Sequence, residues 1–393
     1  MSAVEYRFLE PLDVLFLRGN KLFGDPGSYG ESLVPPWPSV AAGALRSAQL
    51  VYKGYDPARF ARGEIMDDRE LGTPDRPGTF TITAFQLARR FENSAVEPLF
   101  GLPADLVIAR DREGKLVPRR ITPQSSAHGI QSSAATERLA VLPEPERGKP
   151  VTGLWLTAEG WKRHLHGQDI EPDRHLVPSS CLWRIDTRVG VGLDRQRRRA
   201  ADGQLFTAQA VALRKREHDG ADGEVSFDTG FLAGVTGAAL SDRFPVRLGG
   251  DGRAALASRV EPAVPEPDYE AIAHSRRCRL ILATPGLFEG GWLPTGASGT
   301  GRDLRFELHG VRGRIVCAAV PRAEVVSGWD LAINHPKPAR RAAPTGSVYW
   351  IDQLEATPAA LRKLVERGLW DEPCQDEARR AEGFNRVHVA AWA

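Results

Sequence analysis

Alternation of apolar and polar residues predicts a chain rich in strands. In residues 4–9, Val4, Tyr6 and Phe8 alternate with charged side chains, which is the pattern of a half-buried strand. Comparable alternation, or a run rich in β-branched residues, predicts further strands at 79–88, 182–193, 205–213, 254–260, 277–283, 313–320, 346–351 and 386–392.

Apolar residues spaced three or four positions apart predict helices between these strands. Residues 40–52 carry one apolar face and follow Ser39, which we expect to cap the helix. Small apolar residues predict another helix at 231–240. Two more helices are expected, one within 155–164 behind Thr157 and one that opens at Thr357 and Pro358.

The order of these elements is similar in the two halves of the chain. Each half opens with a strand and closes with a helix, a glycine-containing turn and a strand, which predicts an α+β fold of two tandem ferredoxin-like (RRM-like) domains with loop insertions and a long β-hairpin. We place the N-terminal domain at residues 1–262, with an insertion at about 105–180 and the hairpin at about 182–213. The C-terminal domain would span 268–393, behind a proline-rich acidic linker.

Composition agrees with a turn-rich globular protein. Its 393 residues suffice for two to three domains, and 42% hydrophobic with 26% charged residues excludes a disordered chain. The 39 glycines and 29 prolines favour strands and loops over a helical bundle. Apolar runs fall far short of the ~20 residues that cross a bilayer, and no secretory signal is visible, so we expect a cytoplasmic protein without a membrane partner.

Arginine dominates the basic residues. The net charge is only +2, but 44 of the 52 basic residues are arginine, whose planar fork matches phosphate. A GC-rich genome would also produce this bias, so the position of the arginines has to decide. Between Arg184 and Arg199, six arginines stand against two aspartates, at the end of the predicted hairpin. Such a tip could follow a phosphate backbone or be a solvated basic turn.

A second motif, residues 249–252, is a Gly-Gly-Asp-Gly sequence. Polymerase palms and nucleotidyl cyclases carry a similar turn, but their metals need at least two carboxylates. Here Arg253 follows, with no second acid adjacent to Asp251, so we expect no metal, no cofactor and no catalysis. The glycines would instead let backbone N–H groups approach a phosphate, or simply form a tight turn.

An ordered set of motifs resembles one known family along nearly the whole chain. These motifs lie at residues 11–19, 35–39, 43–46, 188–194, 203–206, 248–253, 346–349 and 382–384. Together they resemble the third subunits of Cmr (type III-B) CRISPR effector complexes, which belong to the RAMP superfamily.

The resemblance implies a non-catalytic, RNA-binding subunit in antiviral defence. Members of that family hold the 5′ handle of the crRNA, dock on the large polymerase-palm subunit and on backbone subunits, and meet target RNA only indirectly. Asn385 stands where many relatives have a second glycine, and asparagine tolerates the left-handed conformation of such a turn. Carried over to this sequence, the expected RNA-binding residues are Arg18, Ser39, Arg46, Arg184, Arg188, Arg195, Arg197, Arg198, Arg199, Gly249, Gly250, Arg253, Gly383 and Asn385.

Two other functions remain open from the sequence. A CRISPR repeat-cleaving endoribonuclease uses the same tandem fold and often has a histidine acid or base in the early helices of its first domain. The first histidine here is His128, which disfavours that alternative. The other alternative is a stand-alone RNA-binding module.

Overall fold

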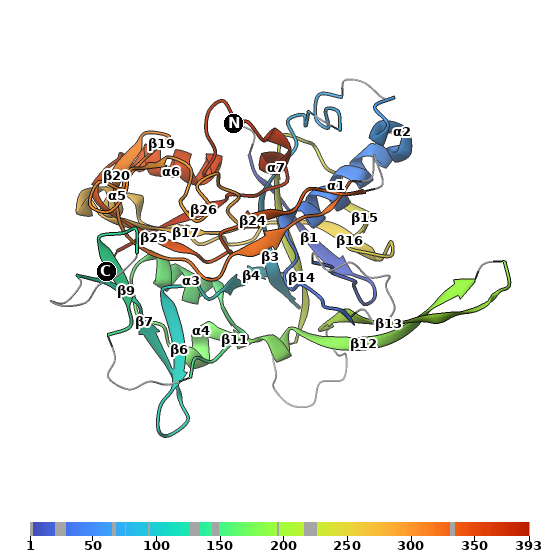
Figure 1. Ribbon diagram of the computed structural model, residues 1–393, viewed down its shortest axis with the longest axis horizontal. Coiled ribbons are helices and arrows are strands. Elements are labelled where there is room, and N and C mark those ends of the chain that lie inside the picture. Colours follow the sequence, from blue (N-terminus) through green and yellow to red (C-terminus); the bar gives the residue numbers. More distant parts are fainter. Residues whose placement is uncertain are drawn as a thin grey trace. The chain divides into compact units, whose positions relative to one another are not determined.

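The structure is a computed structural model of the chain (Figure 1). It describes residues 3–19, 29–64, 68–74, 76–92, 95–125, 134–143, 149–194, 196–215, 226–330 and 335–392. The fold is a mixed α/β fold in which strands, at 44%, outweigh helices, at 17%, and it contains several antiparallel sheets. Among the described residues, no helix is both long and apolar enough to cross a membrane.

The chain forms two compact units. The first comprises Met1–Val96, Ser180–Pro262 and Val325–Arg340, and the second Glu97–Ser179, Ala263–Glu324 and Arg341–Ala393. Each unit is built on a six-stranded sheet.

The first unit's sheet has the strand order β15-β16-β1-β14-β3-β4. Helix α1 contacts β3 and β15, and α2 lies beside α1. The elements are β1 (Glu5–Pro11), α1 (Pro38–Tyr52), α2 (Pro57–Ala61), β3 (Thr81–Phe91), β4 (Val96–Pro98), β14 (Phe227–Thr236), β15 (Arg243–Arg247) and β16 (Ala254–Val260). The last segment of this unit contains a small hairpin of β22 (Trp329–Asp330) and β23 (His335–Pro336). The paired strands β21 (Glu324–Val326) and β24 (Arg340–Ala342) lie at the two ends of this segment.

The predicted helix at 231–240 is wrong, because these residues belong largely to strand β14. This strand pairs with β1 on one side and β3 on the other, and nine of its ten residues are buried. A strand buried on both faces reads as a nearly continuous apolar run, here residues 230–235, so it lacks the alternation that marks a half-buried strand. The turn after it is held by Arg7, whose buried guanidinium donates to the carbonyl oxygens of Leu240 (2.7 Å) and Ser241 (3.2 Å).

The start of α1 also differs from the prediction. Trp37 is the N-cap, without a side-chain hydrogen bond, and Pro38 occupies the first helical position. Proline suits that position because its missing N–H would lack a helical partner there. Ser39 therefore lies inside the first turn and does not cap the helix.

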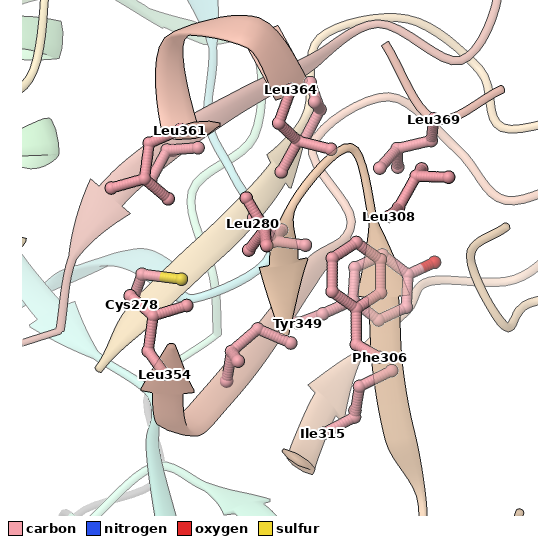
Figure 2. Close-up of a cluster of buried hydrophobic side chains, with 14 of the residues drawn as sticks. Cys278, Leu280, Phe306, Leu308, Ile315, Tyr349, Leu354, Leu361, Leu364 and Leu369 are labelled. Atoms are coloured by element: carbon pink, nitrogen blue, oxygen red, sulfur yellow. The ribbon is translucent and has the colours of Figure 1, made fainter. Parts of the chain in front are cut away.

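The second unit's sheet has the strand order β18-β19-β20-β25-β17-β26. Its core includes Leu361 and Leu364 of α6 with Leu280 of β17, as Figure 2 shows. Thr357 caps α6 as predicted, since its hydroxyl oxygen accepts from the Ala360 N–H at 3.1 Å. The elements are α5 (Tyr269–Ser275), β17 (Cys278–Leu282), β18 (Ala297–Ser298), β19 (Arg305–Leu308), β20 (Val311–Ala319), β25 (Val348–Glu355), α6 (Pro358–Arg367), α7 (Glu377–Ala381) and β26 (Val387–Ala391).

Residues 97–179 belong to this second unit, whereas the sequence placed about 105–180 as an insertion in the first domain. Phe100, Leu156 and Trp161 share one buried cluster with Val348 and other residues of the second sheet. The segment contains β5 (Phe100–Gly101), β6 (Leu106–Arg110), β7 (Leu116–Arg120), β8 (Thr122–Ser125), β9 (Arg138–Val141), β10 (Leu154–Leu156), α3 (Ala158–Leu165), α4 (Pro172–His175) and β11 (Leu176–Pro178). As predicted, Thr157 caps α3.

A buried charge network joins this segment to β17. Arg279 forms an ion pair with Asp105, donates to the His164 carbonyl oxygen at 2.7 Å and donates to the Ala391 carbonyl oxygen at 2.7 Å. The His164 Nε2 lies 3.2 Å from the Asp105 carboxylate. Burial favours the neutral acid, but the interactions with His164 and with the Arg279 guanidinium outweigh it and hold the pKa of Asp105 well below its usual value.

Replacing Asp105 with asparagine should therefore destabilise the second unit strongly. Asp105→Asn leaves the Arg279 charge buried without its counter-ion, which costs about 3–5 kcal/mol when one partner of a buried pair is removed. Urea unfolding of the full chain measures the loss. The exposed ion pair of Glu113 and Lys115 provides the control, because Glu113→Gln should change stability little. Equal stability of the two variants would show that the network is dispensable.

Candidate nucleic-acid interface

The predicted hairpin is present in the first unit. Strands β12 (Trp183–Asp194) and β13 (Arg199–Leu213) pair antiparallel, and β2 (Tyr29–Gly30) joins β13 as a third strand. Figure 1 shows β12 and β13 as a long two-stranded ribbon. Most side chains along β12 are exposed or half-buried, as expected for a ribbon that packs only at its base.

Strand alternation gives this ribbon two unlike faces. We call one the arginine face; Arg184, Asp186, Arg188 and Gly190 lie on it, opposite Ala212, Ala210, Ala208 and Phe206 of β13. The guanidinium of Arg188 donates to the Asp186 carboxylate at 2.9 and 3.0 Å. Both side chains remain more than 40% exposed, so solvent or an anion can reach this pair.

The opposite, aliphatic face exposes large apolar side chains. It carries Ile185, Val189, Val191 and Leu205, with exposed fractions of 42%, 69%, 44% and 59%. Leu193, which is 68% exposed, follows beyond a shift in the register. Monomeric proteins rarely leave such a contiguous apolar stripe in water, so this face is a candidate contact surface.

The tip of the hairpin is an aspartate-centred turn. The Asp194 carboxylate accepts from the N–H groups of Gln196 (3.0 Å) and Arg197 (3.1 Å), and Arg198 adopts the left-handed conformation at φ 50°. Arg199 then lies opposite Asp194 in the strand register. The turn leaves the side chains of Arg197, Arg198 and Arg199 exposed, whereas Arg195 lies outside the described residues.

The glycine loop, residues 248–253, connects β15 to β16. Gly249 and Gly252 have φ values of +78° and +64°, which allow the chain to turn where other residues would be strained. The N–H of Leu248 donates to the Arg253 carbonyl oxygen across the loop, and the N–H of Gly250 donates to the Phe16 carbonyl oxygen at 2.8 Å.

Two arginines flank this loop, each beside a carboxylate. Arg18 contacts Asp251 at 3.0 Å, and Arg253 contacts Asp13 at 2.8 Å. The guanidinium of Arg253 also lies 5.1 Å from the centroid of the Phe16 ring.

Residues 13–18 bring the glycine loop and the hairpin together. Leu15 and Val211 exchange two backbone hydrogen bonds, of 2.9 and 2.8 Å, so the segment runs beside β13. The Phe16 side chain packs against Ala208 and Ala210, which lie on the arginine face. Residues 13–18 therefore connect the glycine loop and its two arginines to the base of the arginine face within the first unit.

Four of the expected RNA-binding residues lie elsewhere. Ser39 and Arg46 are on α1, where Arg46 donates to the Leu71 carbonyl oxygen at 2.7 Å. Gly383 and Asn385 are in the second unit. Gly383 is buried, and its carbonyl oxygen accepts from the Thr284 hydroxyl at 2.9 Å.

Asn385 adopts the left-handed conformation that the sequence allowed, at φ 57°. Its side chain is fully buried, however, and is used within the protein: it accepts from the Leu287 N–H at 2.6 Å and donates to the Leu369 carbonyl oxygen at 3.1 Å. Asn385 therefore holds two neighbouring segments together and presents no surface to an RNA.

Sequence reasoning missed three residues that shape the interface: Asp13, Phe16 and Phe206. Phe16 looked like one more member of an apolar run, and the ion-pair partner of Arg253 stands 240 positions away in the chain. Only the strand register of the hairpin, which pairs Gly190 with Phe206, could have drawn attention to Phe206.

Comparison with protein families identifies the chain. Residues 7–392 match the family model described as CRISPR-associated protein (Cas_Cmr3). The chain belongs to this family. The resemblance carried by the short sequence motifs is thereby confirmed over nearly the whole chain.

Two solved structures are similar to this member of the family. One is a chain of the Type III-B Cmr-beta complex bound to cognate target RNA and AMPPnP, with 14% identity, a TM-score of 0.47 and coverage of 97% of this chain and 95% of that chain. The other is a chain of the Type III-B Cmr-beta complex bound to cognate target RNA, with 14% identity, a TM-score of 0.46 and coverage of 97% and 96%. No curated protein matches the chain.

An alanine at Gly249 should destabilise the protein more than an alanine at Gly252. A Cβ at Gly249 would lie 2.8 Å from the Phe16 carbonyl oxygen, in addition to the strain of a positive φ, so Gly249→Ala should cost about 2 kcal/mol or more. Gly252→Ala meets nothing within 4 Å and should cost only the backbone strain, about 1 kcal/mol. Urea unfolding compares the two variants; equal losses would mean that the loop is not pressed against Phe16.

Proposed function

We propose that the chain is a non-catalytic, RNA-binding subunit of a type III-B CRISPR effector complex, acting in antiviral defence. Membership of the Cas_Cmr3 family supports the complex. The observation that supports RNA binding is that residues 13–18 bring the glycine loop, Arg18 and Arg253 to the base of the hairpin that carries the arginine face.

This surface offers the groups that a single-stranded RNA backbone requires. Arginines donate paired hydrogen bonds to phosphate oxygens, and exposed loop backbone can approach the strand closely. Arg18 and Arg253 already contact carboxylates in partly exposed positions, so a phosphate can compete with Asp251 or Asp13 for these guanidinium groups. The hairpin tip extends the same basic surface through Arg197, Arg198 and Arg199, which are all exposed.

We propose the 5′ handle of the crRNA as the RNA that binds here, with target RNA met only indirectly. The protein partners would be the large polymerase-palm subunit and backbone subunits of the complex. The exposed aliphatic face of the hairpin supports the existence of a contact surface in an assembly. Ser39 and Arg46 remain proposed contacts on α1, whereas the buried Asn385 side chain is left out.

We also infer a ferredoxin-like unit in each six-stranded sheet. In the first unit β16-β1-β14-β3 has the strand order of a βαββαβ motif whose first helix is α1 and whose second helix is replaced by the turn that Arg7 holds. In the second unit β26-β17-β25-β20 has the same order, and α6 follows the third strand. These two units would be the tandem domains expected from the sequence.

The alternative of a repeat-cleaving nuclease is less well supported. The helices α1 and α2 of the first unit contain no histidine that could act as acid or base, and the first histidine of the chain, His128, lies outside the described residues. Purified chain incubated with repeat RNA and with target RNA, with and without Mg²⁺, should leave both RNAs intact on a denaturing gel. Products that disappear with His128→Ala or Asp251→Asn would establish a nuclease instead.

Changing the three tip arginines tests the RNA-binding role. Each neutralised phosphate of a single strand contributes about −0.7 to the slope of log affinity against log salt. Replacing Arg197, Arg198 and Arg199 with alanine should therefore weaken binding of handle-bearing crRNA and flatten that slope by about two units.

Arg174 provides the control for this variant, because it is an exposed arginine of the second unit that contacts Glu171. Arg174→Ala should leave the slope as it is in the parent. Identical slopes for the tip variant and the parent would show that the tip is a solvated turn or a protein contact.

A further inference from the structure

The arginine face of the hairpin carries one aromatic ring, that of Phe206. Phe206 stands directly opposite Gly190 in the register, and a Cβ built at Gly190 would overlap its ring. The ring therefore lies across the backbone of β12, in the space that the absent side chain leaves. Because Phe206 is half-buried, part of its outer surface remains open.

An aromatic ring that packs over a glycine of the neighbouring strand also stabilises a sheet. In a sheet covered by other side chains, this stabilising role alone would explain why Phe206 stands opposite Gly190. Two observations point further. The ring is only half-buried, although Phe206 lies one residue before Thr207, where β2 joins β13, and its neighbour on the same face is the exposed Arg188. A flat ring next to an arginine is the combination with which proteins hold single-stranded nucleic acid.

The ring also lies between the two basic parts of the surface. Towards the base of the hairpin, Ala208 and Ala210 of the same face pack on Phe16, beside the glycine loop. Towards the tip, β13 leads back to Arg199. An RNA strand that followed both basic parts would pass over Phe206.

We propose that the open face of Phe206 is a stacking platform for one base of single-stranded RNA, with Arg188 beside it for the adjoining phosphate. This inference rests on the proposed RNA binding and adds to it a contact to a base. Arg188 lies two residues from Gly190 on the same strand, about 7 Å away, which an adjoining phosphate can bridge. Stacking is tolerant of base identity, so the platform would hold the strand without reading its sequence.

Binding of a fluorescein-labelled oligo(U) of about 15 nucleotides to the full chain tests the platform. Phe206→Ala should weaken binding about 5- to 150-fold, which corresponds to the loss of one stacked base. Its salt slope should equal that of the parent, because no phosphate contact is lost. Phe206→Trp, which keeps a flat ring, should bind as well as the parent.

Leu205→Ala is the matched control, because Leu205 is the adjacent residue of β13, points to the aliphatic face and is 59% exposed. This variant should bind the RNA like the parent. Gly190→Ala leaves Phe206 in the chain but displaces its ring, so it should weaken binding as Phe206→Ala does. Matching melting curves would show that the variants remain folded.

An oligonucleotide of the same length without bases shows whether the loss of affinity in Phe206→Ala results from lost base stacking. On this probe the parent and Phe206→Ala should bind equally well. A loss that persists without bases, or equal binding of parent and Phe206→Ala to oligo(U), would overturn the platform. If the platform fails while the tip arginines still change the salt slope, the proposed RNA binding stands; if the parent binds no RNA at all, both are wrong.

Discussion

The main chain at Leu15 and Phe16 is paired with two segments that lie about 200 positions away in the sequence. Leu15 exchanges hydrogen bonds with Val211 of the hairpin, and the Phe16 carbonyl oxygen accepts from Gly250 of the glycine loop. Main-chain pairing fixes position more tightly than side-chain contacts do, because both partners are held by backbone geometry. The relative placement of hairpin and loop, and with it the proposed RNA surface, depends on this short segment.

The positive charges of the arginines on this surface are compensated by carboxylates of the protein itself. Arg18, Arg188 and Arg253 each contact a carboxylate, which explains how a chain with a net charge of only +2 can concentrate arginines without strong repulsion. All three pairs are partly exposed, so they contribute little to stability. In the RNA binding that we propose, these pairs would hold the guanidinium groups in place until a phosphate replaces the carboxylate.

The hairpin of β12 and β13 carries two chemically different faces, the arginine face and the aliphatic face. A two-stranded ribbon has no interior of its own, and such ribbons are at best marginally stable alone. Its base is anchored by the 13–18 segment, while the outer part exposes arginines with one aromatic ring on one face and aliphatic side chains on the other. The period of two along the strands allows the two faces to be specified independently.

Local rules read from the sequence succeeded for several features that neighbours along the chain determine, although they misplaced the cap of α1. The alternation at residues 4–9 predicted β1, Thr157 and Thr357 predicted helix caps, and the charged stretch between two apolar strands predicted the hairpin with its arginine-rich tip. The glycine loop was also located, since its turn requires residues that accept positive φ. Each of these features depends on a few consecutive residues.

Only the tertiary structure decided the features that depend on distant partners. Residues 231–236 are a strand because β1 and β3 cover both of its sides, and residues 97–179 join the second unit because Asp105 and Phe100 find their partners there. Asn385, expected at an RNA contact, is buried by segments that the sequence places far from it. Side-chain burial and strand pairing depend on segments that are distant in the sequence, so they cannot be predicted from a residue's immediate neighbours.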